Sequence, residues 1–317
     1  MPPELCAACA IGPADEIIAK GRREPRRTAI LYNRSHEIVH EGLGRLNHDW
    51  MWTFIALKSA QVPVDVIIEE DLNPDDLKRY DCVVVGGLNL ARRHVAALKT
   101  WVEAGGLLIG AGGAAMADVY DDPMPETGEL FGARQALSGP GNTASVARVT
   151  FPATDAFPAA DLAPGGLAFL LTPTTGRSLA TYKGGECAAV ANAVGKGQAI
   201  LLGFQPGLTF RDNGRAAGPV RAWLIAPVLK RLGRQRVEFD HPASEVTLFE
   251  HDSGLAVMLA SFGGPSPEGG SRLSVRTDRP IKEVASALRG PLEWSRAGDR
   301  IEIQTRRLEP VDVVILR

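Results

Sequence analysis

The 317-residue chain has little of several features that would place it in a familiar class. Four cysteines are too few to hold a chain of this length together by disulfides, and Cys82 and Cys187 stand in apolar segments that predict buried side chains. Cys6 and Cys9 have the spacing of a redox pair or of half a zinc site, but no nearby Cys or His pair supplies the further ligands. We therefore expect no metal.

An excess of charge of either sign is also missing. Lys and Arg number 35 against 37 Asp and Glu, so the basic surplus typical of nucleic-acid-binding proteins is absent. No apolar run approaches the roughly 18 residues that would span a bilayer. The N-terminal Met-Pro-Pro-Glu-Leu lacks the basic segment that begins a signal peptide. We expect a cytoplasmic protein with neither a nucleic-acid nor a membrane partner.

The glycine-rich motifs of nucleotide binding are missing as well. No G-x-G-x-x-G opens the first strand–helix unit, and no Walker lysine follows a glycine-rich loop. Gly195-Lys196-Gly197 joins two predicted strands, so it cannot offer a helix N-terminus to a phosphate group. We therefore expect no nucleotide and no other cofactor.

From residue 28 the sequence alternates short apolar strands with amphipathic helices. The pattern predicts strands at 28–32, 64–68, 80–87 and 107–109, with longer helices over 46–60 and 91–103. Continuously apolar strands indicate that both faces of the sheet are covered. The fold class is therefore α/β, with a doubly wound, mainly parallel sheet of the flavodoxin or amidotransferase type.

Changes in this pattern predict three parts. Residues 1–27 form an N-terminal arm and linker, and residues 28–233 form the α/β domain with a β-rich insertion at about 123–182. After residue 234, several short strands separated by polar turns and without helices predict a small antiparallel β-sandwich over 234–317.

The turn after the fourth strand, Gly-Ala-Gly-Gly-Ala over 110–114, is informative for what it lacks. A strand, a sharp glycine-flanked turn and a helix form a nucleophile elbow, which holds Ser or Cys above the sheet edge. Ala111 and Gly112 occupy the crest here, and neither carries a nucleophilic atom. We predict the scaffold of an elbow without its nucleophile, which excludes covalent acyl chemistry there and favours a non-catalytic role.

The order of these elements resembles the class I glutamine amidotransferase-like fold, and within it the β-galactosidase trimerisation domain. The resemblance rests on short apolar, acidic and glycine-containing stretches at 64–67, 71–72, 80, 83–85, 98–109, 118–122, 130–132 and 195–200. It covers residues 28–317, because a β-sandwich commonly follows in that family. It implies an amidotransferase relative without its catalytic cysteine, consistent with Gly112, that supports assembly and shapes the active site of an attached glycosidase barrel.

The chain departs from the family pattern in one respect. No barrel of about 250 residues precedes the domain, so we expect either a free-standing relative or the C-terminal part of a larger enzyme. The resemblance implies that the protein associates with itself as a dimer or trimer. It also implies a glycosidase barrel or a carbohydrate as a further partner.

Polar side chains follow several predicted strands where ligands of a doubly wound sheet bind, beyond the C-terminal strand ends. The candidate ligand-binding residues are Asn33, His36, Glu37, Asn89, Asp118 and Asp122. If their loops converge, they line one polar pocket. Imidazole titrates near neutrality, so His36 and Glu37 are the candidates for a general base and its partner.

Three functions fit this sequence. The first is a non-catalytic amidotransferase-like scaffold that assembles into oligomers and binds carbohydrate. The second is a hydrolase, glycoside-related or metal-assisted, that uses the His36/Glu37 loop and the Asp118–Asp122 loop without a covalent nucleophile. The third is an interaction module in which these polar loops are merely solvated. We predict the first, because the crest of the fourth strand lacks an attacking atom.

Overall fold

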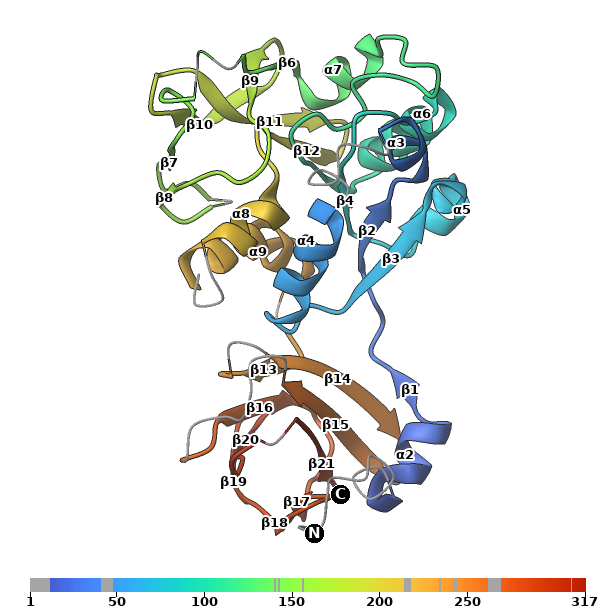
Figure 1. Ribbon diagram of the computed structural model, residues 1–317. Helices are drawn as coiled ribbons and strands as arrows, with labels where there is room; N and C mark the ends of the chain where they lie inside the picture. Colours follow the sequence, from blue (N-terminus) through green and yellow to red (C-terminus); the bar gives the residue numbers. More distant parts are fainter. Residues whose placement is uncertain are drawn as a thin grey trace. The chain divides into compact units, whose positions relative to one another are not determined.

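The computed structural model describes residues 12–40, 48–139, 141, 143–155, 157–213, 218–233, 235–241, 244–261, 269–308 and 310–317. The chain forms two compact units (Figure 1). The α/β unit comprises residues 26–57 and 64–233, and the β unit comprises the described residues of 1–25, 58–63 and 234–317. Residues 12–25, which the sequence assigned to an arm, thus belong to the unit that holds the C-terminal strands.

The parallel part of the α/β unit is built from five short, apolar strands. They are β2 (Thr28–Tyr32), β3 (Val64–Ile68), β4 (Cys82–Val85), β5 (Leu107–Gly110) and β12 (Gly197–Leu202). They lie in the order β3-β2-β4-β5-β12, and every neighbouring pair is parallel. β4 and β5 are buried along their whole length. A strand buried on both faces gains most from Val, Leu and Ile, which is why the apolar runs predicted this sheet correctly.

The same sheet continues as an antiparallel half. Its strands are β6 (Ala133–Leu137), β7 (Val149–Phe151), β8 (Ala160–Leu162), β9 (Phe169–Pro173), β10 (Arg177–Tyr182) and β11 (Cys187–Val194). β11 pairs with β12 through a tight hairpin in which Gly195 has φ +57°. The segment predicted as an insertion therefore supplies strands that extend the main sheet.

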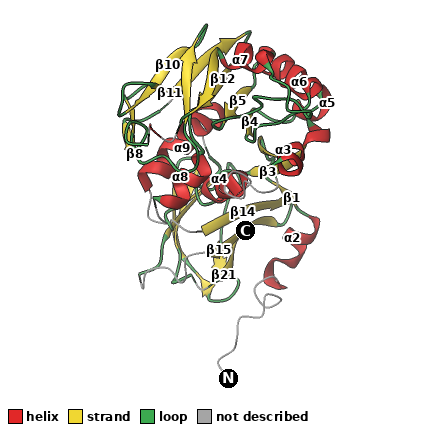
Figure 2. Ribbon diagram, turned by 45° about the horizontal axis from the view of Figure 1, so that its top comes forward, coloured by secondary structure: helices red, strands yellow, loops and turns green. Residues whose placement is uncertain are grey.

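Helices cover both faces of the sheet (Figure 2). They are α3 (Arg34–Val39), α4 (Asp49–Lys58), α5 (Pro74–Leu77), α6 (Arg92–Glu103), α7 (Pro125–Phe131), α8 (Pro206–Asp212) and α9 (Gly218–Leu232). α5 starts as its sequence predicts, since the side chain of Asn73 accepts hydrogen bonds from two first-turn amides and Pro74 occupies the first turn. Val95, Leu98 and Val102 of α6 are buried against the strands.

The β unit contains two antiparallel sheets. The larger follows the order β1-β14-β15-β21-β17-β18 and the smaller the order β13-β16-β20-β19. The strands are β1 (Arg22–Arg23), β13 (Val237–Phe239), β14 (Ser244–His251), β15 (Gly254–Ser261), β16 (Arg272–Arg276), β17 (Val284–Ser286), β18 (Gly290–Pro291), β19 (Glu293–Ala297), β20 (Arg300–Gln304) and β21 (Val311–Leu316). Both sheets contribute to one core, in which Leu255 and Val257 meet Val275 and Ile301. The predicted fold class, an α/β domain followed by a β domain, is confirmed.

The N-terminal residues complete the β unit. A short turn, Gly12–Ala14, leads into α2 (Asp15–Lys20). Ala14 and Ile17 are buried in a small cluster with Phe249, Ala256 and Ile315. α2 therefore covers a face of the larger sheet that would otherwise expose apolar side chains.

The described residues contain neither a membrane-spanning helix nor a group of metal ligands. None of their helices is long and apolar enough to cross a membrane. Within the same residues, no three His, Cys, Asp or Glu side chains are grouped as metal ligands would be.

Cys82 is a buried and Cys187 a half-buried free thiol, whereas Cys6 and Cys9 lie outside the described residues. Burial raises the pKa of the Cys82 thiol, which keeps it protonated.

Phe151 is a buried residue of the α/β unit, and its substitution tests the packing there. Its ring lies 4.3 Å from that of Trp223 and 5.6 Å from that of Phe157. We expect Phe151→Ala to lower the free energy of unfolding by about 3–5 kcal/mol, because it leaves a cavity. Urea denaturation followed by tryptophan fluorescence measures this loss. Leu137→Ala, which changes a side chain that is 57% exposed, is the control; an equal loss in both variants would contradict this account.

Candidate functional site

A small pocket lies at the C-terminal ends of β2, β4 and β5. Its volume is about 20 Å³, which is room for about one water molecule. The polar side chains in its wall are Asn33, His36, Glu37, Asp49 and Gln205, and the backbone of Gly86–Leu88 and Ala111–Gly112 completes it. The pocket is therefore where a doubly wound sheet binds ligands, but it is too small for a sugar ring.

Asn33 and His36 hold the β2 loop against the β4 loop. The Asn33 side chain caps α3 by accepting from the His36 backbone N–H at 3.0 Å, and it donates to the Gly86 carbonyl at 2.9 Å. His36 is 2% exposed, and its Nδ1 accepts from the backbone N–H of Leu88 at 3.1 Å. Because Nδ1 accepts, the proton of the neutral ring is on Nε2. A Cβ at Gly87 would lie 2.8 Å from His36, so glycine is needed for this approach.

Glu37 is held by a residue of the preceding strand. Its carboxylate accepts from the Tyr32 hydroxyl at 2.6 Å, and this hydrogen bond raises the pKa of Tyr32. The side chain of Trp50 packs edge-on against Tyr32, with the ring centroids 5.4 Å apart. These contacts fix the position of Glu37 in the pocket wall.

Asp49, the first residue of α4, contributes a buried carboxyl group to the pocket wall. It is 5% exposed, and the backbone N–H groups of Gly207 and Leu208 donate to it, the latter at 3.0 Å. Desolvation nevertheless dominates and raises the pKa of Asp49 to about 7. Asp49 therefore joins α4 to the first turn of α8.

Sequence reasoning did not single out Asp49 or Gln205 as site residues. An acidic residue at a helix start normally indicates an exposed partner for the helix dipole, so nothing local predicted the burial of Asp49. Gln205 follows β12, where the sequence predicts only a strand end. A search for polar residues after every parallel strand would have found Gln205.

At the crest of β5, Gly112 has no space for a side chain. The Gly112 backbone N–H donates to the Phe204 carbonyl at 2.9 Å, and the Gly112 carbonyl accepts from Gln205 Nε2 at 2.9 Å. A Cβ at Gly112 would lie 2.8 Å from the Phe169 ring and 2.9 Å from the Phe204 nitrogen. The position where an elbow would carry its nucleophile is thus filled by neighbouring chain.

The prediction of a strand–turn–helix elbow is wrong in one respect, because no helix follows the turn directly. Gly113 and Ala115 have φ of +85° and +48°, which interrupts a right-handed helical path. The Ala115 backbone N–H donates to the Gly87 carbonyl, and Ala117 forms a parallel bridge with Asn89. The segment after β5 is therefore tied to the β4 loop, and the next helix, α7, begins at Pro125.

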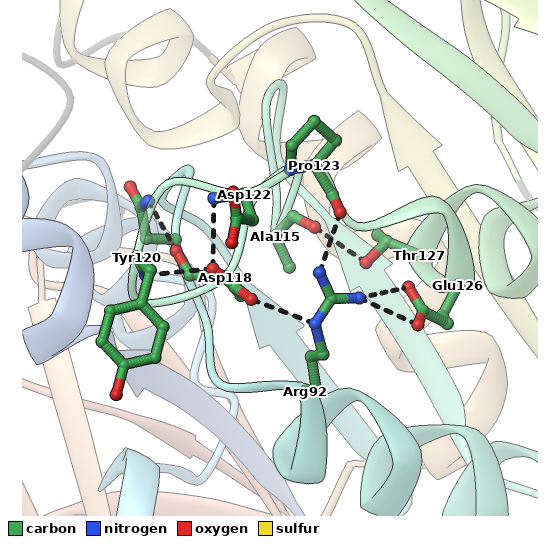
Figure 3. A network of polar contacts seen from close by, with 9 residues as sticks. Arg92, Ala115, Asp118, Tyr120, Asp122, Pro123, Glu126 and Thr127 are labelled. Atoms are coloured by element: carbon green, nitrogen blue, oxygen red, sulfur yellow. Dashed lines mark hydrogen bonds and ion pairs between the residues drawn. The ribbon is translucent and has the colours of Figure 1, made fainter.

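The loop 118–122 is held by a separate network centred on Asp118 (Figure 3). Asp118 Oδ1 accepts from the backbone N–H groups of Tyr120 and Asp122 at 3.0 and 3.1 Å, and Oδ2 accepts from Arg92 Nε at 3.0 Å. The Tyr120 amide and the other donors hold the pKa of Asp118 below its ordinary value. Asn89 donates to the Asp118 carbonyl at 2.9 Å. Asp118 and Asn89 thus fix the shape of the loop.

The structure therefore divides the six candidate residues into two groups. Asn33, His36 and Glu37 line the small pocket. Asn89, Asp118 and Asp122 are not among the described residues of its wall and belong to the loop network. The two loops do not form a single polar pocket, because Asp118 is turned toward Arg92 and the backbone of its own loop.

Comparison with protein families identifies this architecture. The family model for the β-galactosidase trimerisation domain matches residues 27–213, which is more than half of the chain. The chain belongs to this family. The resemblance inferred from the sequence is confirmed, together with the class I glutamine amidotransferase-like fold.

Solved structures share the fold of this trimerisation-domain chain over nearly all of its length. A β-galactosidase from Bacillus circulans sp. alkalophilus has a TM-score of 0.67 at 14% identity, and a β-galactosidase from Rahnella sp. has 0.67 at 15%. Each covers 95% of this chain and 42% of its own. An α-L-fucosidase from Paenibacillus thiaminolyticus has 0.68 at 12% identity, covering 97% of this chain and 50% of its own.

This chain thus spans half or less of the length of the solved structures that it resembles. Comparison with curated proteins finds no match. At these identities the structural similarity establishes the fold alone.

The raised pKa of Asp49 predicts an unusual pH dependence. The folded protein holds this proton more tightly than the unfolded chain, so the contribution of Asp49 to stability falls as the pH rises from 3.8 to about 7 and then levels off. Asp49→Asn keeps the acceptor for α8 but cannot ionise. We expect the free energy of unfolding of the variant, relative to that of the wild type, to rise by up to about 1.4 kcal/mol per pH unit between these two pH values.

Urea denaturation at several pH values measures this difference. Asp122→Asn, which changes an exposed carboxyl group, is the matched control. A constant difference between Asp49→Asn and the wild type at all pH values would show that Asp49 ionises normally.

Proposed function

We propose that this protein is a non-catalytic, amidotransferase-like scaffold that supports oligomer assembly and contacts carbohydrate, as a relative of β-galactosidase trimerisation domains. The observation that carries the proposal is that a nucleophilic side chain has no room at Gly112, at the crest of β5. Gly112 has no side chain there, and the Phe169 ring and Phe204 backbone occupy the space that one would need. Amidotransferase chemistry requires an attacking atom at such a crest, so the fold is retained for another purpose.

The geometry gives less support to the alternative, a hydrolase that uses the His36/Glu37 and Asp118–Asp122 loops. A pocket of about 20 Å³ is far below the range of roughly 300–1,000 Å³ that small-molecule sites occupy. The Asp118 carboxylate is paired with Arg92 and two backbone amides, which disfavours a role as an acid. His36 Nδ1 is engaged by the Leu88 amide.

Family membership supports the assembly part of the proposal. The family is described as a trimerisation domain of β-galactosidase, and self-association as a dimer or trimer is the corresponding role for this chain. A glycosidase barrel, on the same or another polypeptide, is the partner that this family relationship favours. The solved glycosidases of this fold are at least twice as long as the region that they share with this chain.

The loop 118–122 is the surface that we assign to carbohydrate. Tyr120 is 84% exposed although the loop backbone around it is fixed by Asp118. A tyrosine ring on a fixed loop offers an apolar face with a polar hydroxyl at little entropic cost, which suits stacking on a sugar ring. Asp122 beside it is exposed and can accept from sugar hydroxyl groups.

Sedimentation velocity over a concentration series tests assembly. We expect a dimer or trimer at micromolar concentration. A monomer throughout that range would remove the assembly role.

Activity assays test the absence of chemistry at the β5 crest. We expect no release of ammonia from glutamine and no hydrolysis of a panel of chromogenic glycosides, with a known glutaminase and a known β-galactosidase as positive controls. Glycoside hydrolysis that His36→Ala abolishes would establish the alternative, and any intrinsic glutaminase activity would refute the non-catalytic assignment.

Tyr120 variants test the carbohydrate surface. With lactose as the probe in saturation-transfer NMR, we expect Tyr120→Ala to weaken binding about fivefold, or about 1 kcal/mol, because it removes the apolar face on which the sugar ring would pack. Tyr120→Phe keeps the ring and is the matched control. Equal binding by the wild type and Tyr120→Ala would exclude this loop as the contact.

A further inference from the structure

The edge of the sheet opposite the small pocket carries a second cavity. It lies where β5 and β12 begin, near the C-terminal ends of α6 and α9, and its volume is about 660 Å³. This is within the range of roughly 300–1,000 Å³ typical of small-molecule sites. It is far larger than the pocket at the C-terminal strand ends.

The charge of this cavity is strongly one-sided. Among the described residues that line it, four are cationic, namely Arg177, Lys196, Lys230 and Arg231, and Asp155 is the one carboxylate. The whole chain has a formal net charge of −2, so this concentration of positive charge is local and does not follow from composition. Clefts lined by one sign of charge focus the electrostatic field and attract ions of the opposite sign.

These cations come from separate parts of the fold. Arg177 is the first residue of β10, Lys196 is in the β11–β12 turn, and Lys230 and Arg231 are in the last turn of α9. Two of them lie beside Gly105, since a Cβ there would be 3.6 Å from Arg231 Nη2 and 4.0 Å from the Lys196 Cβ. The basic residues thus converge through tertiary structure.

Helix termini explain only part of this arrangement. Basic residues commonly interact with the carbonyl groups at helix C-termini. Arg231 binds the carbonyl of Gly105, which follows α6, whereas Lys230 binds the carbonyl of Asp155 in the loop between β7 and β8. Arg177 and Lys196 lie in strand and turn segments, and both are exposed. Lys230 and Arg231 neutralise no carboxylate in these contacts, so their charge is still available to a ligand.

We propose that this cavity binds a small multivalent anion that carries two or more linked phosphate-like groups. Four cations around 660 Å³ match a ligand with several charges spread over more than one group better than a single small ion. Arg177 contributes charge from a strand, Lys196 lies in the turn beside the C-terminal end of α6, and Lys230 and Arg231 complete the basic wall. The site is separate from the proposed carbohydrate surface, so the two can be tested independently.

Isothermal titration of the full-length chain with sodium pyrophosphate, at constant ionic strength, tests the proposal. We expect saturable binding by the wild type. The double variant Arg177→Gln/Lys196→Gln is expected to weaken it at least about tenfold. These side chains are exposed, so their replacement should leave the melting temperature of the unliganded protein unchanged. Lys230 and Arg231 are avoided because their hydrogen bonds to backbone carbonyls contribute to the fold.

Lys99→Gln is the matched control. Lys99 lies on α6 and pairs with Glu129 at 3.8 Å, outside the described lining of the cavity. The Lys99→Gln variant should bind pyrophosphate with the same affinity as the wild type. Absence of saturable binding, or equal binding by the double variant, would overturn the site. Equal affinity for inorganic phosphate and pyrophosphate would overturn its assignment to multivalent anions.

Discussion

At the crest of β5 the backbone of Gly112 packs directly against the chain that follows β12. The hydrogen bonds from Gly112 to Phe204 and from Gln205 to Gly112 join the parallel strands to the segment that enters α8. The Phe169 ring closes the same position from the antiparallel half of the sheet. One close approach therefore connects three parts of the α/β unit, and it is incompatible with a nucleophilic side chain at this position.

Most polar residues at this end of the sheet stabilise loops. Asn33 caps α3 and binds the β4 loop, Asp49 accepts from the first turn of α8, and Asp118 orders the loop that bears Tyr120. Such groups are costly to bury unless they are hydrogen-bonded, and here the hydrogen bonds go to backbone amides of neighbouring segments. The outcome is a nearly filled strand edge with one exposed aromatic residue on a fixed loop.

Charge is distributed differently at the two edges of this sheet. At the C-terminal edge, the carboxylate of Asp118 is paired with Arg92 and that of Asp49 is buried. The N-terminal edge holds the wide basic cavity formed with Arg177 and Lys196. A scaffold whose usual ligand edge is filled can thus still offer a recognition site elsewhere, because unused strand and helix ends remain exposed to solvent.

Sequence patterns were sufficient to predict the parallel strands and the helices α5 and α6, because buried parallel strands require continuous apolar runs and both helices have end signals. They did not predict α3, α7 or α8. The sequence by itself also determined that Ala111 and Gly112 lack a nucleophile. Three features were visible only in the folded chain: no helix follows that turn, Asp118 faces Arg92 rather than the pocket, and Asp49 is buried. These outcomes depend on contacts between residues far apart in the chain, such as Asp49 with Leu208, for which local pattern and spacing contain no information.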